Sequence, residues 1–325
     1  MSVFEDDPTA LATPWVESPF FEATAQARGL SETELDRARR FREDGYLVLE
    51  GLIPAELIDA IVARYDWLFD PSTEFEAPDW LRELFRRDAN RRQDAWHVLP
   101  EVRELAAHPE VLATLQLLYG RAPIPFQTLN FLRGTQQPIH SDAMHFSSLP
   151  ARFMCGVWVA FEDVDENNGS LIYHRGSHRL PEVRVDELGV WGEEPRSQLG
   201  ESYAHYERYL AARLQQATDM PLQTLCAPKG SVLIWASNLA HGGGPIHDPD
   251  STRHSQVTHY FFEDCIYYTP IFSDPALGEY FLRDIWDVRT GQKVPHCMNG
   301  EELSVEKFSA HRSRLRRRDP ADRSD

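Results

Sequence analysis

Four side chains that could bind a metal or carry protons lie in one short stretch, "QPIHSDAMHFSSLP". They are His140, Ser141, Asp142 and His145, and the segments on either side are rich in β-branched and aromatic residues. In an extended chain, alternate side chains point to the same face. His140 and Asp142 can therefore converge on one metal ion while Ser141 points away. The same pattern can also arise by accident.

A histidine followed two positions later by an acidic residue is weak evidence by itself. With 13 histidines and 51 acidic residues in the chain, about two such pairs are expected by chance. Besides His140 and Asp142, the pattern occurs at His108 with Glu110 and at His205 with Glu207. Both of these lie in segments of helical pattern, where positions i and i+2 point about 200° apart. We therefore interpret them as surface residues.

A third ligand is needed, and His241 is the candidate. It follows the strand-like segment "SVLIWAS" and precedes glycines 242–244, which permit close approach of backbone or ligand. Two histidines and one carboxylate, with open coordination positions, are typical of non-haem Fe(II) oxygenases. A histidine at a strand end is also often structural, so both interpretations stay open from the residues alone.

The segment after the glycines contains a candidate anion site. If "RHSQVTHYF" is extended, Arg253 and Ser255 share a face of the strand. That face also includes Val257, His259 and Phe261. A buried guanidinium needs an anion, and its planar fork fits the carboxylate of an organic acid. An ion pair with one of the chain's own acidic residues is the alternative.

The elements that must position these residues divide the chain by periodicity. Residues 1–120 are mainly helical in pattern. Within them, "SETE" forms a capping box of Ser31 and Glu34 that opens a helix predicted over residues 31–43. The short strand "YLVLEG" follows that helix. We expect this helical part to pack on a core formed by the residues that follow.

Residues 121–270 carry the β-rich pattern. Short segments such as "IPFQTLNFLR" and "RFMCGVWVAFED" alternate with turn signals such as "DENNG" and "HGGGP". A helix-like insert at about 185–220 interrupts them. This order predicts one domain over residues 1–325, mainly β with flanking helices (α+β), built as a sandwich or barrel.

Charge and composition restrict the partners and the compartment. A net charge of −18 argues against nucleic acid or an anionic membrane as the main partner. The start lacks the apolar run of a signal peptide, no segment approaches a membrane span, and the four cysteines are scattered. We expect a cytoplasmic protein; its oligomeric state is not specified. Residues 271–325 predict a C-terminal extension whose basic end, "HRSRLRRR", we expect to be disordered.

Taken in order along the chain, these motifs resemble one known family. "HSD" at 140–142, "LAHGG" containing His241, and Arg253 followed by Ser255 resemble the phytanoyl-CoA dioxygenase (PhyH-like) family of Fe(II)- and 2-oxoglutarate-dependent oxygenases. "FREDGYLVLEGLIPAELID" is similar to its N-terminal segment, and "GVWVAFEDVDENNGSLIYHRGSHRLP" to its central block. The likeness covers roughly residues 36–265 in order, which is more specific than any single motif.

The resemblance implies a double-stranded β-helix, the jelly-roll core of cupin-like proteins, and a role for each motif residue. His140, Asp142 and His241 would hold Fe(II) and form the catalytic centre. Arg253, helped by Ser255, would bind the distal carboxylate of 2-oxoglutarate. Both inferences come from the family and not from the spacing of the residues.

Four further positions match the family less specifically. Asn130 and Trp158 would lie against the cosubstrate, whereas Gln127 and His145 would face the substrate. A strand asparagine or a buried tryptophan is equally often a hydrogen-bonding or core residue. These assignments are therefore expectations for the structure to test.

The implied reaction uses O2 and 2-oxoglutarate to hydroxylate a C–H bond of a small-molecule metabolite in a biosynthetic pathway, with release of succinate and CO2. Desaturation, cyclisation, epimerisation and demethylation stay open because they use the same iron site. Asp142 argues against halogenation, since halogenating relatives carry a small residue there. A non-catalytic metal-binding jelly-roll protein and a zinc hydrolase are alternatives from other classes, but a zinc hydrolase would leave Arg253 unexplained. The substrate itself is not identified.

Overall fold

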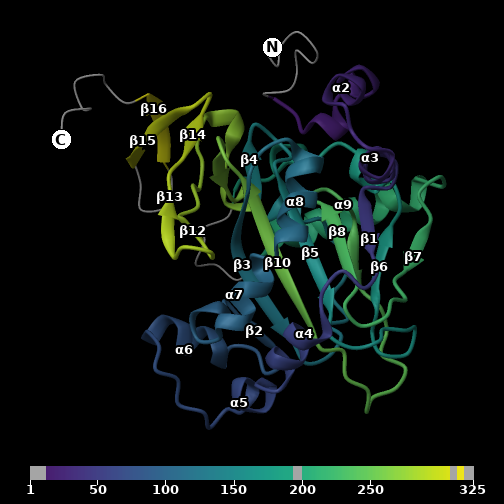
Figure 1. The fold of residues 1–325 in the computed structure, drawn as a ribbon. Helices are drawn as coiled ribbons and strands as arrows, with labels where there is room; N and C mark the ends of the chain where they lie inside the picture. The colour runs from purple at the N-terminus through teal and green to yellow at the C-terminus, as the bar shows by residue number, and fades with distance from the viewer. Residues whose placement is uncertain (1–11, 193–199, 308–312, 318–325) are drawn as a thin grey trace.

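Two antiparallel sheets face each other at the centre of the protein (Figure 1). The computed structural model describes residues 12–192, 200–307 and 313–317. The larger sheet has the strand order β1-β8-β5-β10-β3-β2 and the smaller one β7-β6-β9. The larger sheet is formed by β1 Tyr46–Leu49, β8 Val232–Ala236, β5 Met154–Ala160, β10 Ser255–Phe262, β3 Pro123–Phe131 and β2 Arg91–Gln93. The smaller sheet is formed by β7 Leu222–Thr224, β6 Leu171–His174 and β9 His241–Gly243.

The N-terminal helices cover the outer face of the larger sheet (Figure 1). In the described residues these helices are α2 Phe21–Arg28, α3 Glu32–Asp44, α4 Ala55–Val62, α5 Tyr65–Phe69, α6 Asp79–Arg86, α7 Pro100–Ala106 and α8 Pro109–Tyr119. The later helix α9, Glu201–Gln216, belongs to the insert between β6 and β7. α3 begins with the predicted capping box, in which Ser31 accepts from the Glu34 amide, and it ends at Gly45 in the left-handed conformation.

Alternation along the strands separates the two cores. Trp158, Leu233 and Trp235 point inward and pack against the smaller sheet. Their neighbours Val157 and Ile234 point outward and pack against the helices. Because both faces of the central strands are buried, the sequences of these strands are nearly continuous runs of apolar residues. This sandwich with helices on one side confirms the predicted mainly β, jelly-roll fold class.

The C-terminal part adds small sheets beside this core (Figure 1). They are formed by β4 Ser147–Leu149 with β11 Ile266–Tyr268, by β12 Ile285–Asp287 with β13 Gln292–Val294, and by β14 Cys297–Met298, β15 Glu301–Lys307 and β16 Ser313–Arg317. The expectation of a disordered basic tail is wrong for residues 313–317, because their backbone pairs with β15. The rest of that basic segment lies outside the described residues. No helix in the described part of the chain is long and apolar enough to cross a membrane.

Candidate metal centre and its cavity

The two candidate histidines are held side by side by backbone hydrogen bonds. The His140 amide donates to the His241 carbonyl (2.9 Å), and the His241 amide donates to the His140 carbonyl (2.8 Å). The glycines after His241 make this pairing possible. A Cβ at Gly242 would lie 2.7 Å from the Gln137 carbonyl oxygen, so a larger residue would push the two chain segments apart.

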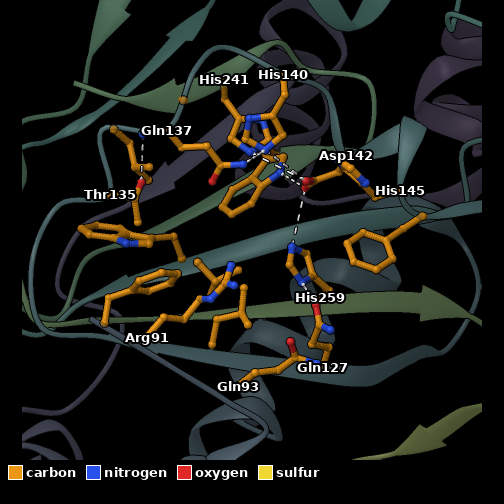
Figure 2. A pocket seen from close by; sticks show the side chains of 18 of the residues that line it. Arg91, Gln93, Gln127, Thr135, Gln137, His140, Asp142, His145, His241 and His259 are labelled. Atoms are coloured by element: carbon orange, nitrogen blue, oxygen red, sulfur yellow. Dashed lines mark hydrogen bonds and ion pairs between the residues drawn. The ribbon is translucent and has the colours of Figure 1, made fainter. Parts of the chain in front are cut away.

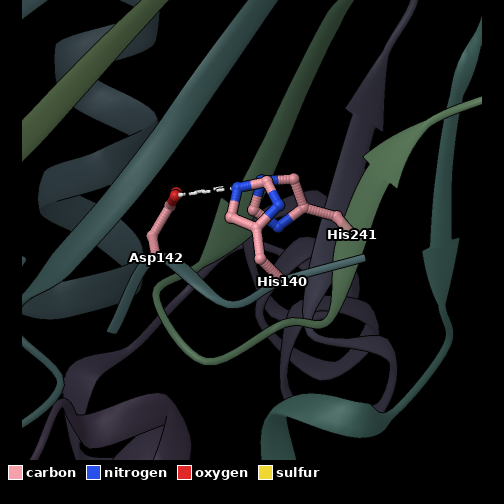
Figure 3. A group of neighbouring side chains, drawn as sticks. All are labelled: His140, Asp142 and His241. Carbon is pink, nitrogen blue, oxygen red and sulfur yellow. Dashed lines mark ion pairs between the residues drawn. The ribbon is translucent and has the colours of Figure 1, made fainter. Parts of the chain in front are cut away.

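Asp142 completes a cluster of three buried side chains (Figure 3). It begins a single 3-10 turn, and Ser141 caps that turn by accepting from the Ala143 amide, so the serine faces away from the cluster. Asp142 Oδ1 lies 3.7 Å from His140 Nε2 and 3.9 Å from His241 Nε2. One ligand atom from each residue lies within 4.8 Å of the others, so a single ion can contact all three.

Hydrogen bonds select the ring nitrogen that each histidine presents. The Nδ1 of His140 lies 2.9 Å from the Pro138 carbonyl oxygen, and that of His241 lies 2.9 Å from the Leu239 carbonyl oxygen. A carbonyl oxygen only accepts, so both Nδ1 atoms carry the proton and both Nε2 atoms are free to bind a metal. Burial lowers the pKa of His140 to about 3, so its imidazole is neutral at pH 7.

The carboxylate of Asp142 is oriented by a side chain that sequence reasoning did not assign. The Trp235 indole Nε1 donates to Asp142 Oδ2 (2.7 Å), and His259 Nε2 lies 3.7 Å from the same oxygen. Burial raises the pKa of Asp142, but the surrounding histidines and the indole lower it by a larger amount, so that the pKa is about 2. Asp142 is therefore an anion. His259 shares its strand face with Arg253, which was a usable signal, whereas the indole contact depends on packing between distant segments.

A cavity of about 320 Å³ opens beside this cluster (Figure 2). Besides the cluster, its walls include polar side chains from several elements: Arg91, Gln93, Gln127, Gln137, His145 and Tyr203. Tyr203 comes from α9 in the insert, and its hydroxyl lies 3.2 Å from His145 Nε2. The sequence pattern did not indicate that the insert reaches the cavity.

Arg253 lines the same cavity, and Glu162 acts on it electrostatically only from beyond ion-pair distance. It is 1% exposed, and its Nε and Nη1 atoms are buried without a hydrogen-bond partner. Burial lowers the pKa of Arg253 to about 10, and its guanidinium carbon lies 5.7 Å from the ring of Trp158, another wall residue. No ion pair within the described residues involves Arg253. Unsatisfied buried donors are costly, so the site is suited to a carboxylate ligand.

Two of the predicted site residues do not reach the cavity. Asn130 points to the opposite face of β3, where its Nδ2 donates to Gln256 Oε1 (3.2 Å). The physical reason is alternation, because Gln127, Leu129 and Phe131 take the cavity face of this strand. Ser255 is buried, but its hydroxyl turns back toward the Arg253 carbonyl (3.5 Å) and it is not among the wall residues.

The predicted substrate-facing residues do line the cavity. Gln127 Oε1 accepts from His259 Nδ1 (3.1 Å), which connects it to Asp142 through the imidazole (Figure 2). His145 lies opposite Tyr203, as described above. Gln137, which was not predicted, places its amide 3.3 Å from His140 Nε2.

Known proteins match the part of the chain that carries these motifs. The sequence profile described as "Phytanoyl-CoA dioxygenase (PhyH)" matches residues 41–255. The peroxisomal phytanoyl-CoA dioxygenase of Rattus norvegicus is 21% identical over 253 residues, which cover 72% of this chain and 70% of that protein. Phytanoyl-CoA dioxygenase domain-containing protein 1 of Bos taurus is 25% identical over 211 residues, covering 48% of this chain and 72% of that protein.

Solved structures share the fold. The epimerase SnoN, in complex with Fe3+, alpha ketoglutarate and nogalamycin RO, has a TM-score of 0.52 at 22% identity, covering 72% of this chain and 86% of that chain. EctD from S. alaskensis, with bound Fe, has a TM-score of 0.52 at 19% identity, covering 72% of this chain and 77% of that chain. At this identity the likeness concerns the fold.

Proposed function

Because the chain belongs to the phytanoyl-CoA dioxygenase (PhyH) family, we propose that it is an Fe(II)- and 2-oxoglutarate-dependent dioxygenase that hydroxylates a C–H bond of a small-molecule metabolite. His140, Asp142 and His241 hold the iron. Arg253 binds the distal carboxylate of 2-oxoglutarate. The products besides the hydroxylated compound are succinate and CO2.

The observation that carries this proposal is the unpartnered guanidinium of Arg253 in the same cavity as the metal cluster. Two imidazoles that present Nε2 and one carboxylate suit a divalent ion such as Fe(II). The cluster alone would also suit zinc, but a hydrolytic zinc site has no use for a buried, unpaired cation nearby. A vestigial site would have no reason to keep that cation unpaired either, since an unsatisfied buried charge is costly.

The protein's own residues position the reactants. Trp235 holds Asp142 as a carboxylate, and the carbonyl contacts hold the two imidazoles with Nε2 toward the ion. Iron with 2-oxoglutarate and O2 supplies the oxidant that removes hydrogen from a substrate carbon. The cavity walls restrict which substrate hydrogen faces the ion.

The cavity walls also favour a polar substrate over a long aliphatic chain. Near the cluster they present the amides of Gln127 and Gln137, the imidazole of His145 and the phenol of Tyr203. Such groups cost free energy when an apolar ligand covers them, whereas a ligand with its own donors and acceptors satisfies them. Desaturation and cyclisation use the same iron site and differ only in where the substrate is held.

The proposal is tested by spectroscopy and by one matched pair of variants. Anaerobic addition of Fe(II) and 2-oxoglutarate should give the weak visible charge-transfer band of the chelate. Asp142→Ala should abolish succinate formation. Glu110→Ala removes the acidic partner of His108, a pair with the same sequence spacing on α8, and should leave succinate formation unchanged.

Several outcomes would refute the proposal. Metal-loaded protein without the band cannot have 2-oxoglutarate on its iron. Succinate formation that survives Asp142→Ala would exclude the carboxylate as a ligand. A screen of metabolites for substrate-dependent succinate release then identifies the substrate.

A further inference from the structure

A second cavity of about 580 Å³ adjoins the iron cavity. We call it the indole chamber, and six of the residues that line it carry the reasoning below: Trp80, Gln93, Asp94, Gln127, Arg283 and Trp286. The metal cluster and Arg253 do not contribute to its walls. The proposed iron chemistry leaves this chamber without a role.

The two cavities share part of their walls. Gln93 at the end of β2 and Gln127 in the neighbouring strand β3 line both. In Figure 2 these two side chains lie beyond His259, on the side away from the metal cluster. The partition therefore includes two amide side chains, and a ligand that reaches from the iron cavity into the chamber passes beside them.

Arg283 places a guanidinium with an unsatisfied hydrogen-bond donor at the chamber wall. Its Nη1 donates to Thr269 Oγ1 (2.9 Å), but its Nε is enclosed and has no hydrogen-bond partner. The guanidinium lies 4.6 Å from the ring of Phe146, which is itself a wall residue of the iron cavity. Burial lowers the pKa of Arg283 to about 10, so it stays charged at pH 7.

The nearby carboxylate of Asp94 makes its hydrogen bonds to groups other than this cation. Asp94 accepts hydrogen bonds from the Thr128 amide (3.0 Å) and from Gln93 Nε2 (3.2 Å). Asp94 and Arg283 act on each other electrostatically, but the described residues show no hydrogen bond or ion pair between the two side chains. An enclosed guanidinium nitrogen with no acceptor is the feature expected of a site for a carboxylate or a similar acidic group.

Two large indoles give the chamber flat apolar walls. Trp80 on α6 is 51% exposed and Trp286 on β12 is 47% exposed. α6 packs against β2, and β12 packs against β3, so both indoles are anchored at the same edge of the larger sheet. Trp80 is also held edge-on against His97, with ring centroids 5.2 Å apart. Half-exposed aromatic rings around a hollow are typical of binding sites for other rings.

Space near the iron is limited. The iron cavity of about 320 Å³ must hold 2-oxoglutarate as well as the reacting part of the substrate. A larger substrate can place its remote part in the adjoining chamber. Remote binding of this kind also positions the reacting carbon.

We infer that the indole chamber binds the part of the substrate remote from the oxidised carbon, and that this part is a flat ring bearing an acidic group. That this ligand is part of the substrate rests on the proposed function. The chemistry of the ligand is inferred from Trp80, Trp286 and Arg283 alone. The ring packs against the indoles, and its acidic group pairs with the guanidinium of Arg283.

The test uses naphthoate as the probe, with uncharged naphthamide as its matched analogue, and measures binding by calorimetry and by saturation-transfer NMR. The full-length protein should bind naphthoate more tightly than naphthamide. Arg283→Gln should weaken naphthoate binding about tenfold or more and remove the preference for the anion. Trp286→Ala should weaken both probes, because it removes a wall of the ring site.

Two control variants separate the chamber from the rest of the molecule. Trp191→Ala removes another tryptophan, 68% exposed and not a wall residue, and should leave naphthoate binding unchanged. His241→Ala removes a proposed iron ligand and should leave it unchanged as well, so failure of the iron proposal does not affect this measurement. Thermal melting of each variant checks that it is folded.

Three results would overturn the inference. The first is that the native protein binds naphthoate and naphthamide with equal affinity, or that folded Arg283→Gln or Trp286→Ala binds naphthoate as tightly as the native protein does. The second is displacement of naphthoate by 2-oxoglutarate, which would place the probe in the cosubstrate site. The third comes from the metabolite screen: a compound that releases succinate but does not displace naphthoate would show that the chamber is not part of the substrate site.

Discussion

Replacing Gly156 with alanine should weaken iron binding although Gly156 contacts no proposed ligand. Gly156 on β5 pairs with Trp235 on β8, and a Cβ at Gly156 would lie 2.1 Å from the indole ring. The added methyl group must displace this ring. The indole Nε1 would then move away from Asp142 Oδ2, to which it donates at 2.7 Å.

The size of the effect follows from that hydrogen bond. A hydrogen bond to a charged group contributes about 1.5–3 kcal/mol. Loss of a partner that orients a metal ligand typically lowers metal affinity about 10- to 100-fold. This fold-change corresponds to a free energy in the same range as that hydrogen bond. Trp235→Phe removes the N–H and keeps most of the ring, so it should give a similar loss of affinity. Overpacking by Gly156→Ala should also lower the free energy of unfolding by about 1–3 kcal/mol.

Anaerobic titration with Fe(II), or calorimetry with Mn(II), measures the affinity, and urea unfolding measures stability. Val157→Ala is the control, because Val157 is buried on the same strand but faces the helices. It should lower the free energy of unfolding without changing metal affinity. Unchanged affinity in both Trp235→Phe and Gly156→Ala would refute the role of the indole.

Three further predictions test other parts of the structure. Arg253→Gln should raise the 2-oxoglutarate concentration needed for half-maximal succinate formation about tenfold or more while Fe(II) affinity stays the same; an unchanged requirement would contradict its role. Burial lowers the pKa of His178 and of His259 to about 4, so between about 6.5 and 4 only the unfolded chain takes up these protons. The free energy of unfolding of the metal-free protein should therefore fall as pH falls through that window, and a flat urea-unfolding profile would disagree. Ser31→Ala should lower stability by about 1 kcal/mol through loss of the capping box with Glu34, measured by thermal unfolding.

Local patterns predicted the parts of the site that depend on neighbouring residues in the chain. Extended spacing put His140 and Asp142 on one side and Ser141 on the other, as the structure has them. The capping box located the start of α3. The glycines after His241 indicated a close approach, and the structure shows that the approaching group is the backbone near Gln137.

Two predicted site residues lie away from the cavity for a tertiary reason. On β3, alternation makes Gln127 and Asn130 point to opposite faces, and only the packing of the sheet decides which face meets the cavity. The family resemblance included both residues, whereas the sheet admits only Gln127. Ser255 was assigned to the cavity by the same alternation, but its hydroxyl turns back to the backbone.

The sequence by itself determined the types of side chain at the site, the strand and helix segments that carry them, and the family to which they belong. These depend on covalent spacing and local hydrogen bonds, which act within a few residues. Only the tertiary structure decided that Trp235 holds Asp142, that Tyr203 from the insert reaches the cavity, and that a second chamber adjoins it. Those features arise where segments far apart in the chain pack together, and no local pattern specifies which segments meet.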